Sequence, residues 1–172
     1  MSASVVLLRG VNVGRSNRIA MADLRTALER AGCRDVRTYV QSGNAVVQWD
    51  GGTRALEQAV RAELAAGGLD VPVMARTAAE LGRVVDACPW QDLDPKLLHV
   101  GFLAGPLDPA VVEAVDHEAL LPERLAVGDG VVYLDYAAGV HRSRGLDRLR
   151  LGVDLTARNW RTVTTLRALA DG

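Results

Sequence analysis

The stretch TYVQSGNAVVQW, Thr38 to Trp49, decides the fold because it has the pattern of two short strands joined by a tight turn. We expect strands over 36–41 and 44–49. The Ser-Gly-Asn turn between them calls for a positive φ at Gly43, while Asn44 tolerates the next position. The sequence therefore predicts an antiparallel β-hairpin at the centre of the first half of the chain.

The segments on either side of this hairpin supply the rest of one folding unit. A short apolar run, Val5 to Arg9, predicts a buried strand. Apolar residues repeat at helical spacing over 21–32 and 53–68, and both helices end at glycines. A last strand is expected over 71–76. The predicted order is β-α-β-β-α-β.

The second half repeats this pattern in modified form. It begins with a T-x-x-E capping box at Thr77 and Glu80, and Asp108-Pro109 is typical of a helix start. The expected elements are a helix over 77–88, a strand over 96–104, a helix over 108–120, a hairpin over 124–136, a short helix over 144–151 and a last helix from Thr156 that carries Trp160.

This element order predicts an α+β fold of two tandem ferredoxin-like (βαββαβ-type) repeats with an extra C-terminal helix. We place the first repeat at 1–76. The second repeat, with the C-terminal helix, covers 77–172 and is expected to pack closely on the first.

Composition narrows the class of protein. The chain has 172 residues, 49% of them hydrophobic, and no apolar stretch approaches the length of a membrane span. Cys33 and Cys88 stand alone, without CxxC spacing, so we expect neither a zinc site nor a disulfide. These features favour a cytoplasmic protein with no metal, no cofactor and no membrane partner.

The charge is unevenly distributed along the chain. Residues 9–37 hold seven arginines against three acids, and residues 141–167 hold seven against two. The middle, 80–135, holds eleven acids against three basic residues. If the fold brings the two arginine-rich ends together, they form one basic face that would attract anions. The alternative is that these arginines are solvated helix surface.

The segment RGVNVGRSNR, which follows the first strand, is the first candidate binding loop. Arg9, Asn12, Gly14 and Asn17 could surround an anion, because glycines let consecutive backbone N–H groups point into a nest. The loop matches neither GxxxxGK[ST] nor GxGxxG. The alternative is a simple strand-to-helix turn in which the asparagines bond their own backbone.

The hairpin supplies a second group of polar side chains, Tyr39, Gln41, Ser42 and Asn44. In a strand, Arg37, Tyr39 and Gln41 would share one face. A ligand-binding stripe and an ordinary solvent-facing sheet surface both fit this pattern.

The segment TARNWRTV, 156–163, completes the predicted site. We interpret it as a helix start capped by Thr156, where Arg158 and Asn159 would grip an anion with the helix dipole behind it. Trp160 is expected to pack in the core. The ligand-binding residues are then predicted to lie around one concavity: Arg9, Asn12, Gly14, Asn17, Tyr39, Gln41, Ser42, Asn44, Arg158 and Asn159.

No catalytic group stands out. His99 lies in an apolar strand and His117 in an acidic helix, and only His141 has basic and hydroxyl neighbours. No nucleophile elbow or metal-ligand spacing is present. The sequence leaves open whether the protein is an enzyme.

Five motifs resemble the bacterial domain-of-unknown-function family 1697 in order and spacing. They are LLRGVNVG (7–14), TYVQSGN (38–44), FLAG (102–105), VVYLDY (131–136) and TARNWRTV (156–163). The resemblance covers essentially the whole chain and implies a two-repeat α+β fold. It implies no activity, because the family has none established.

The favoured function is binding of an anionic small molecule, such as a nucleotide or phosphorylated metabolite. An RNA-binding module is one alternative, since ferredoxin-like sheets can stack bases. The low aromatic content of 4% and the missing RNP pattern weigh against it. A protein-interaction domain without catalysis is the other. The sequence does not specify an oligomeric state.

Overall fold

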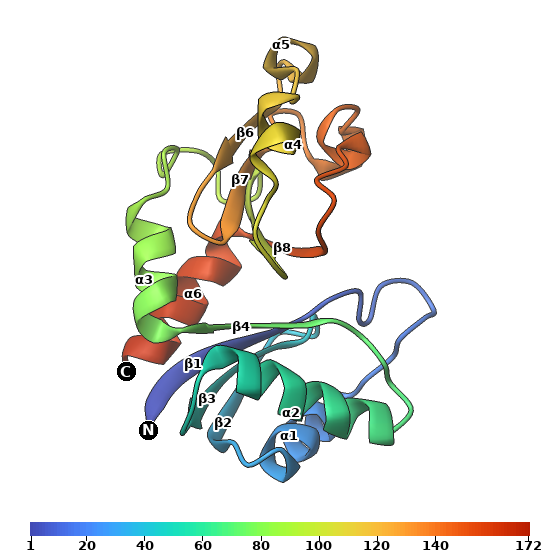
Figure 1. The fold of residues 1–172 in the computed structure, drawn as a ribbon, viewed down its shortest axis with the longest axis vertical. Helices are drawn as coiled ribbons and strands as arrows, with labels where there is room; N and C mark the ends of the chain where they lie inside the picture. The colour runs from blue at the N-terminus through green and yellow to red at the C-terminus, as the bar shows by residue number, and fades with distance from the viewer. The chain divides into compact units, whose positions relative to one another are not determined.

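The computed structural model describes all residues from 1 to 172 and contains two compact units. The first unit is Met1–Arg83 together with Thr165–Gly172, and the second is Val84–Thr164. Each unit contains one four-stranded antiparallel sheet (Figure 1). The fold is therefore mixed α+β. None of its helices is both long and apolar enough to cross a membrane.

The first unit has the predicted β-α-β-β-α-β order. Its sheet runs β2-β3-β1-β4, so β1 and β3 are the central strands. The elements are β1 (Ser2–Leu8), α1 (Met21–Arg30), β2 (Arg34–Tyr39), β3 (Asn44–Trp49), α2 (Thr53–Ala66) and β4 (Val73–Thr77), followed by α3 (Ala78–Asp86).

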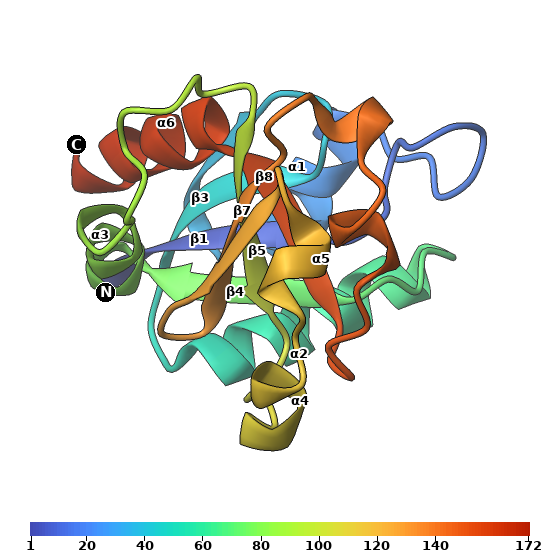
Figure 2. The ribbon, with the colours of Figure 1, turned by 90° about the horizontal axis from the view of Figure 1, so that it is seen from above.

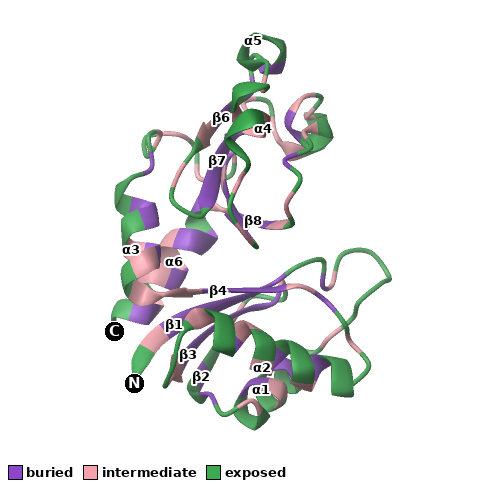
Figure 3. Ribbon diagram, in the orientation of Figure 1, coloured by how far each residue is buried: buried purple, intermediate pink, exposed green.

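Helices α1 and α2 cover one face of this sheet (Figure 1). Leu24 and Leu28 of α1 are buried, as are Leu56, Val60 and Leu64 of α2, at the spacing that the sequence predicted. Figure 3 shows the strands buried and the outer sides of both helices exposed. Regular amphipathic helices thus hold the first unit together by burying an apolar stripe.

The first strand of the first hairpin lies two residues earlier than predicted, at 34–39 instead of 36–41, and the second strand, 44–49, is confirmed. Strand β2 ends at Tyr39, so Val40 and Gln41 belong to the loop and the expected polar stripe stops before Gln41. The positive φ at Gly43 is confirmed at 76°. A Cβ at Gly43 would also lie 2.6 Å from Cγ2 of Val11 and 2.8 Å from Cβ of Leu8. Gly43 is therefore needed for space as well as for conformation.

The second unit has the same sheet order with shorter connections. Its sheet runs β6-β7-β5-β8. Figure 2 shows β7, β5 and β8 of this sheet. The elements are β5 (Leu98–Leu103), α4 (Pro109–Glu113), α5 (His117–Leu120), β6 (Arg124–Val127), β7 (Val131–Asp135), the 3₁₀ turns η1 (Val140–Arg142) and η2 (Leu146–Arg148), β8 (Leu155–Asn159) and the start of α6 (Trp160–Asp171).

Two predicted helices of this unit differ from the structure. The single helix expected over 108–120 is two short helices, because Asp116 starts a second one by accepting a hydrogen bond from the Ala119 N–H at 3.0 Å. The first begins as predicted, with Asp108 as its cap. The helix expected over 144–151 is reduced to the 3₁₀ turn η2.

The prediction that the last helix begins at Thr156 was wrong, because residues 156–159 form a strand. These residues belong to β8, which pairs with β5, and the helix begins only at Trp160. The sequence Leu-Thr-Ala-Arg-Asn lacks the β-branched and aromatic density of an obvious strand, and the arginines favoured a solvent-exposed helix end. Pairing with the central strand overrides that weak local preference.

The two sheets match position by position. At the end of β1 the Leu8 N–H donates to the Gly43 carbonyl at 2.8 Å. At the end of β5 the Leu103 N–H donates to the Gly130 carbonyl at 3.0 Å. Both glycines have positive φ. The last glycine of each hairpin turn therefore accepts the same backbone hydrogen bond from the adjoining central strand.

The last strand of each sheet repeats an arginine. Arg76 in β4 and Arg158 in β8 pair with equivalent residues of β1 and β5. Nη1 of Arg76 donates to the Ala75 carbonyl at 2.7 Å, and Nη1 of Arg158 donates to the Ala157 carbonyl at 2.9 Å. The sequence analysis missed this correspondence, although Ala-Arg occurs at both positions, 75–76 and 157–158.

Candidate functional site

The loop over 9–18 is joined to the hairpin loop over 40–43 by the side chain of Asn12. Its Nδ2 donates to the Gln41 carbonyl at 2.8 Å and to the Ile19 carbonyl at 2.9 Å. Its Oδ1 accepts from the Ile19 N–H at 2.9 Å. These bonds use the whole amide, so Asn12 positions the two loops against each other.

The backbone of the 9–18 loop is strongly turned. Gly10, Asn12, Gly14 and Asn17 have φ of 67°, 54°, 63° and 51°. The Asn12 N–H donates to the Asn17 carbonyl at 3.1 Å, and Nδ2 of Asn17 donates to the Gly10 carbonyl at 3.3 Å. The space where a Cβ of Gly10 or Gly14 would lie is open. The loop thus has a defined shape and leaves room beside its glycines for a bound group.

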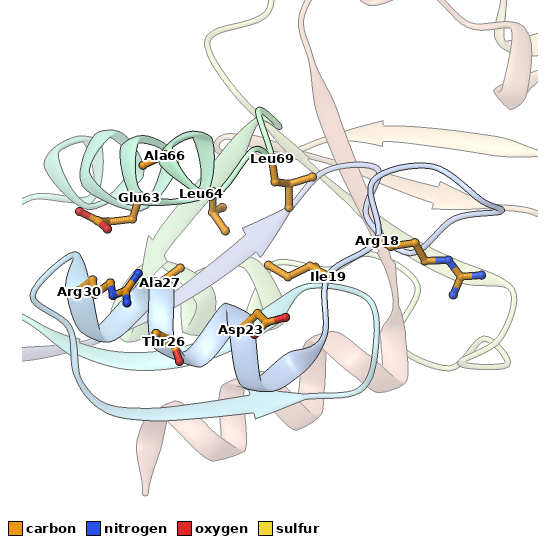
Figure 4. Close-up of a pocket in the computed structure, with 11 residues that line it drawn as sticks. Arg18, Ile19, Asp23, Thr26, Ala27, Arg30, Glu63, Leu64, Ala66 and Leu69 are labelled. Atoms are coloured by element: carbon orange, nitrogen blue, oxygen red, sulfur yellow. The ribbon is translucent and has the colours of Figure 1, made fainter.

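Three arginines of this loop are exposed to solvent: Arg9, Arg15 and Arg18. Neither Arg15 nor Arg18 forms an ion pair. In Figure 4 the Arg18 side chain extends away from α1 and α2. The guanidinium groups of Arg15 and Arg18 are therefore available to an anion in solution.

The polar residues of the hairpin divide into two kinds. Asn44 is fully buried, and its Nδ2 donates to the Tyr39 carbonyl at 3.1 Å and to Oγ of Ser42 at 2.8 Å. Arg37 donates to the Leu169 carbonyl at 2.7 Å. Tyr39 is half-buried and Gln41 is exposed. Asn44 therefore shapes the turn, whereas Gln41 presents its side chain to solvent.

Val40, between these residues, has an unusual backbone. Its φ is 50° and it is 49% exposed. A β-branched residue in this region is strained by about 1–3 kcal/mol. The carbonyls of Tyr39 and Gln41 on either side are held by Asn44 and Asn12. Such strain, held in place by neighbours at an exposed turn, is typical of binding loops.

A pocket of about 420 Å³ lies between α1 and α2 (Figure 4). It has two arginines, Arg18 and Arg30, and two acids, Asp23 and Glu63, in its lining. The balanced charge gives no preference for an anion. The exposed arginine loop next to it carries the basic excess of the first unit.

Arg158 and Asn159 belong to the second unit, where Asn159 stands at the start of α6 as predicted but Arg158 lies within β8. Arg158 is only 9% exposed, its Nη1 donates to Oγ1 of Thr156 at 2.6 Å, and burial lowers its pKa to about 10. The residue that caps α6 is Asn159, whose Oδ1 accepts from the Thr162 N–H at 2.9 Å; Thr156 does not cap it. Their membership of the binding site stays a prediction.

The histidines and acids form no obvious reaction centre. His99 packs edge to face against Tyr136, with ring centroids 5.0 Å apart, and burial lowers its pKa. No three His, Cys, Asp or Glu side chains are grouped as metal ligands. Cys33 and Cys88 are free and buried, and burial raises the pKa of both thiols.

Glu123 is a buried residue that the sequence analysis missed. Its Oε2 accepts from the Gly145 and Leu146 N–H groups, both at 2.9 Å. Burial by itself would raise its pKa, but these bonds and others from Arg144 and Ser143 lower it overall. No local pattern signals this role, because the partners lie more than twenty residues along the chain.

Comparison with known proteins identifies the family. The family described as "Protein of unknown function (DUF1697)" matches residues 1–133, which include the 9–18 loop and the first hairpin. The chain belongs to this family. The predicted membership is therefore confirmed, and Arg158 and Asn159 lie beyond the matched range. No curated protein matches the chain.

A solved structure has the same fold. A conserved bacterial protein from Streptococcus pneumoniae superposes with a TM-score of 0.80 at 22% identity, covering 100% of this chain and 99% of that one. At this identity the likeness concerns the fold alone.

Proposed function

We propose that the first unit of this family member binds an anionic small molecule, such as a nucleotide or phosphorylated metabolite. The binding surface is formed by the 9–18 loop and the hairpin loop over 40–43. Arg9, Arg15 and Arg18 supply positive charge through charge-assisted hydrogen bonds.

The observation that carries this proposal is a difference between the two sheets. The residue after β1, Arg9, donates its N–H to the Pro72 carbonyl at 3.0 Å, and the residue after β5, Ala104, donates to the Asp154 carbonyl at 2.8 Å. The frameworks are equivalent, yet the second loop, 104–108, reads Ala-Gly-Pro-Leu-Asp and has no basic residue. The fold does not need arginines here, which supports a role in binding.

The polar residues then take separate roles. Gln41 and Tyr39 contribute side-chain donors, and the Gly14 tip lets a ligand approach the backbone. Asn12 and Asn44 act by holding the two loops in place, since their amides are bonded within the protein.

We infer further that each unit is a ferredoxin-like repeat. The first sheet's order, β2-β3-β1-β4, and its βαββαβ connections support this assignment. The identical order in the second sheet supports a tandem repeat in which 3₁₀ turns replace one helix. This class of fold hosts many functions, so the fold adds nothing to the choice of ligand.

The test is isothermal titration calorimetry with pyrophosphate and adenosine monophosphate at low ionic strength. We expect saturable binding that is weakened about tenfold by Arg15→Gln or Arg18→Gln, the loss of one charge-assisted bond. Arg54→Gln is the matched control, because Arg54 is an exposed arginine in α2 of the same unit. Equal weakening by all three variants would reduce the effect to net charge and overturn the proposal.

RNA binding is the competing function with a distinct signature. Binding carried by phosphate contacts would weaken steeply with salt. The sheet residues Val5, Leu7, Val46 and Met74 are buried and non-aromatic, and Tyr39 is the single aromatic residue that strand pairing places on that face, which is too few for a platform that stacks several bases. We expect no sequence-dependent complex with single-stranded RNA near physiological salt, and such a complex in a gel-shift assay would reverse this preference.

A further inference from the structure

The second unit contains a pocket that the proposed function does not use. Its volume is about 530 Å³, within the range of small-ligand sites. One wall is the turn after α5, where Leu121 is 63% exposed next to Leu120 and Pro122. The other is the segment carrying η1 and η2. The pocket therefore combines an apolar wall with a polar one.

The polar wall is basic. Arg142, Arg144 and Arg148 line the pocket, all three are exposed, and none forms an ion pair. Arg142 ends η1 and Arg148 ends η2, so two hydrogen-bonded turns fix their backbones. Asp147, on the same segment, does not line the pocket.

The one carboxylate in the pocket lining, Glu123, already accepts hydrogen bonds from the protein backbone. Glu123 accepts the N–H groups of Gly145 and Leu146 at 2.9 Å and is buried. It stabilises the loop that carries the arginines, and its oxygens face backbone donors. The three guanidinium groups and the single carboxylate give the pocket lining an excess of two positive charges. A doubly charged anion would balance this excess.

We propose that this pocket binds a small organic dianion, a phosphate monoester that carries a short apolar group. The arginines bind the phosphate oxygens, for which the planar guanidinium is well suited. The apolar group lies against Leu121 and Pro122. The site is independent of the first-unit loop, because every residue that lines it belongs to the second unit.

Calorimetry with phenyl phosphate tests this assignment. We expect phenyl phosphate to bind the wild-type protein more tightly than inorganic phosphate does, because only phenyl phosphate covers the apolar wall. Arg144→Gln and Arg148→Gln should each weaken phenyl phosphate binding about tenfold. Arg150→Gln is the control, since Arg150 is an exposed arginine two positions from Arg148 that does not line the pocket.

The variant Leu121→Ser tests the contribution of the apolar wall separately from that of the basic wall. It should reduce the preference for phenyl phosphate over inorganic phosphate without lowering the affinity for inorganic phosphate. Arg15→Gln, in the first unit, should leave phenyl phosphate binding by this pocket intact. The variants therefore distinguish a failure of this proposal from a failure of the proposed function of the first unit. The proposal is overturned if Arg144→Gln and Arg148→Gln bind phenyl phosphate as the wild type does, or if Arg150→Gln weakens it equally.

Discussion

The two sheets have the same strand order, but different kinds of connection hold them. In the first unit α1 and α2 have 10 and 14 residues and bury regular apolar stripes. In the second, α4 and α5 have 5 and 4 residues, and the other crossover contains only 3₁₀ turns. The strand framework therefore tolerates replacement of helices by irregular chain.

In the second unit, side-chain carboxylates hold the short connections in place through hydrogen bonds to the backbone. Asp108 and Asp116 cap the short helices, and the buried Glu123 holds the segment before η2. These irregular connections still bury Leu120, Leu146 and Leu151, and the charged hydrogen bonds add to that packing. The two units should therefore respond differently to substitution and to pH.

The largest expected effect is at the packed turn of the first unit. Gly43→Val should lower the free energy of unfolding by about 3–5 kcal/mol, because a valine there combines positive φ with overlap against Val11 and Leu8. Urea unfolding followed by circular dichroism measures the loss.

Gly68→Ala is the control for this substitution. Gly68 also has positive φ, at 89°, but no atom lies within 4 Å of the position of a Cβ. We expect a cost of only about 1 kcal/mol. Similar losses for Gly68→Ala and Gly43→Val would mean that conformation alone, and not the contact with Leu8, makes the glycine necessary.

The second unit should be most sensitive at Glu123. Glu123→Ala leaves the Gly145 and Leu146 N–H groups without their acceptor, which should cost about 2–3 kcal/mol. Because the folded-state pKa is lowered, this stability is present above the ordinary value near 4.5 and is lost as the pH falls through the folded-state value. The wild type and Glu123→Ala should therefore converge in acid. The exposed Glu113→Ala should show neither effect.

The sequence predicted the first unit well because its signals are local. The spacing of Leu56, Val60 and Leu64 indicates a helix without reference to the rest of the chain. In the same way, Gly43 by itself indicates the turn of the first hairpin. Arg158 illustrates the opposite case. Its strand is defined by pairing with β5, and neither that partner nor the burial of the arginine is encoded in neighbouring residues.

The candidate site shows the same division. The loop with Arg9 and Gly14 could be found from composition, because glycines and arginines are concentrated there. The sequence could not show that the side-chain amides of Asn12 and Asn44 donate hydrogen bonds to backbone carbonyls, because each bond depends on how the chain folds. Structural and binding asparagines look alike in sequence.

A smaller effect tests the match between the two last strands. Thr77 and Asn159 follow the repeated arginines and cap α3 and α6 through the N–H groups of Glu80 and Thr162. Thr77→Ala and Asn159→Ala should each cost about 1 kcal/mol. Asn159→Asp, which keeps the acceptor, should restore most of the loss. A much smaller cost at Asn159 would mean that the two junctions are not equivalent.

The smallest expected effect is a pH dependence carried by the second unit alone. Ser4 in β1 pairs with Thr77, and at the equivalent position His99 in β5 pairs with Asn159. Burial lowers the pKa of His99, so the folded state favours neutral imidazole. Its contribution to stability is present above the ordinary value near 6.5 and is lost as the pH falls below it. Urea unfolding at pH 7.5 and 5.5 should show a modest loss that His99→Gln abolishes and that His117→Gln, at an exposed position, leaves unchanged. If His99→Gln kept the wild-type slope, the acid sensitivity would have to come from groups other than this histidine.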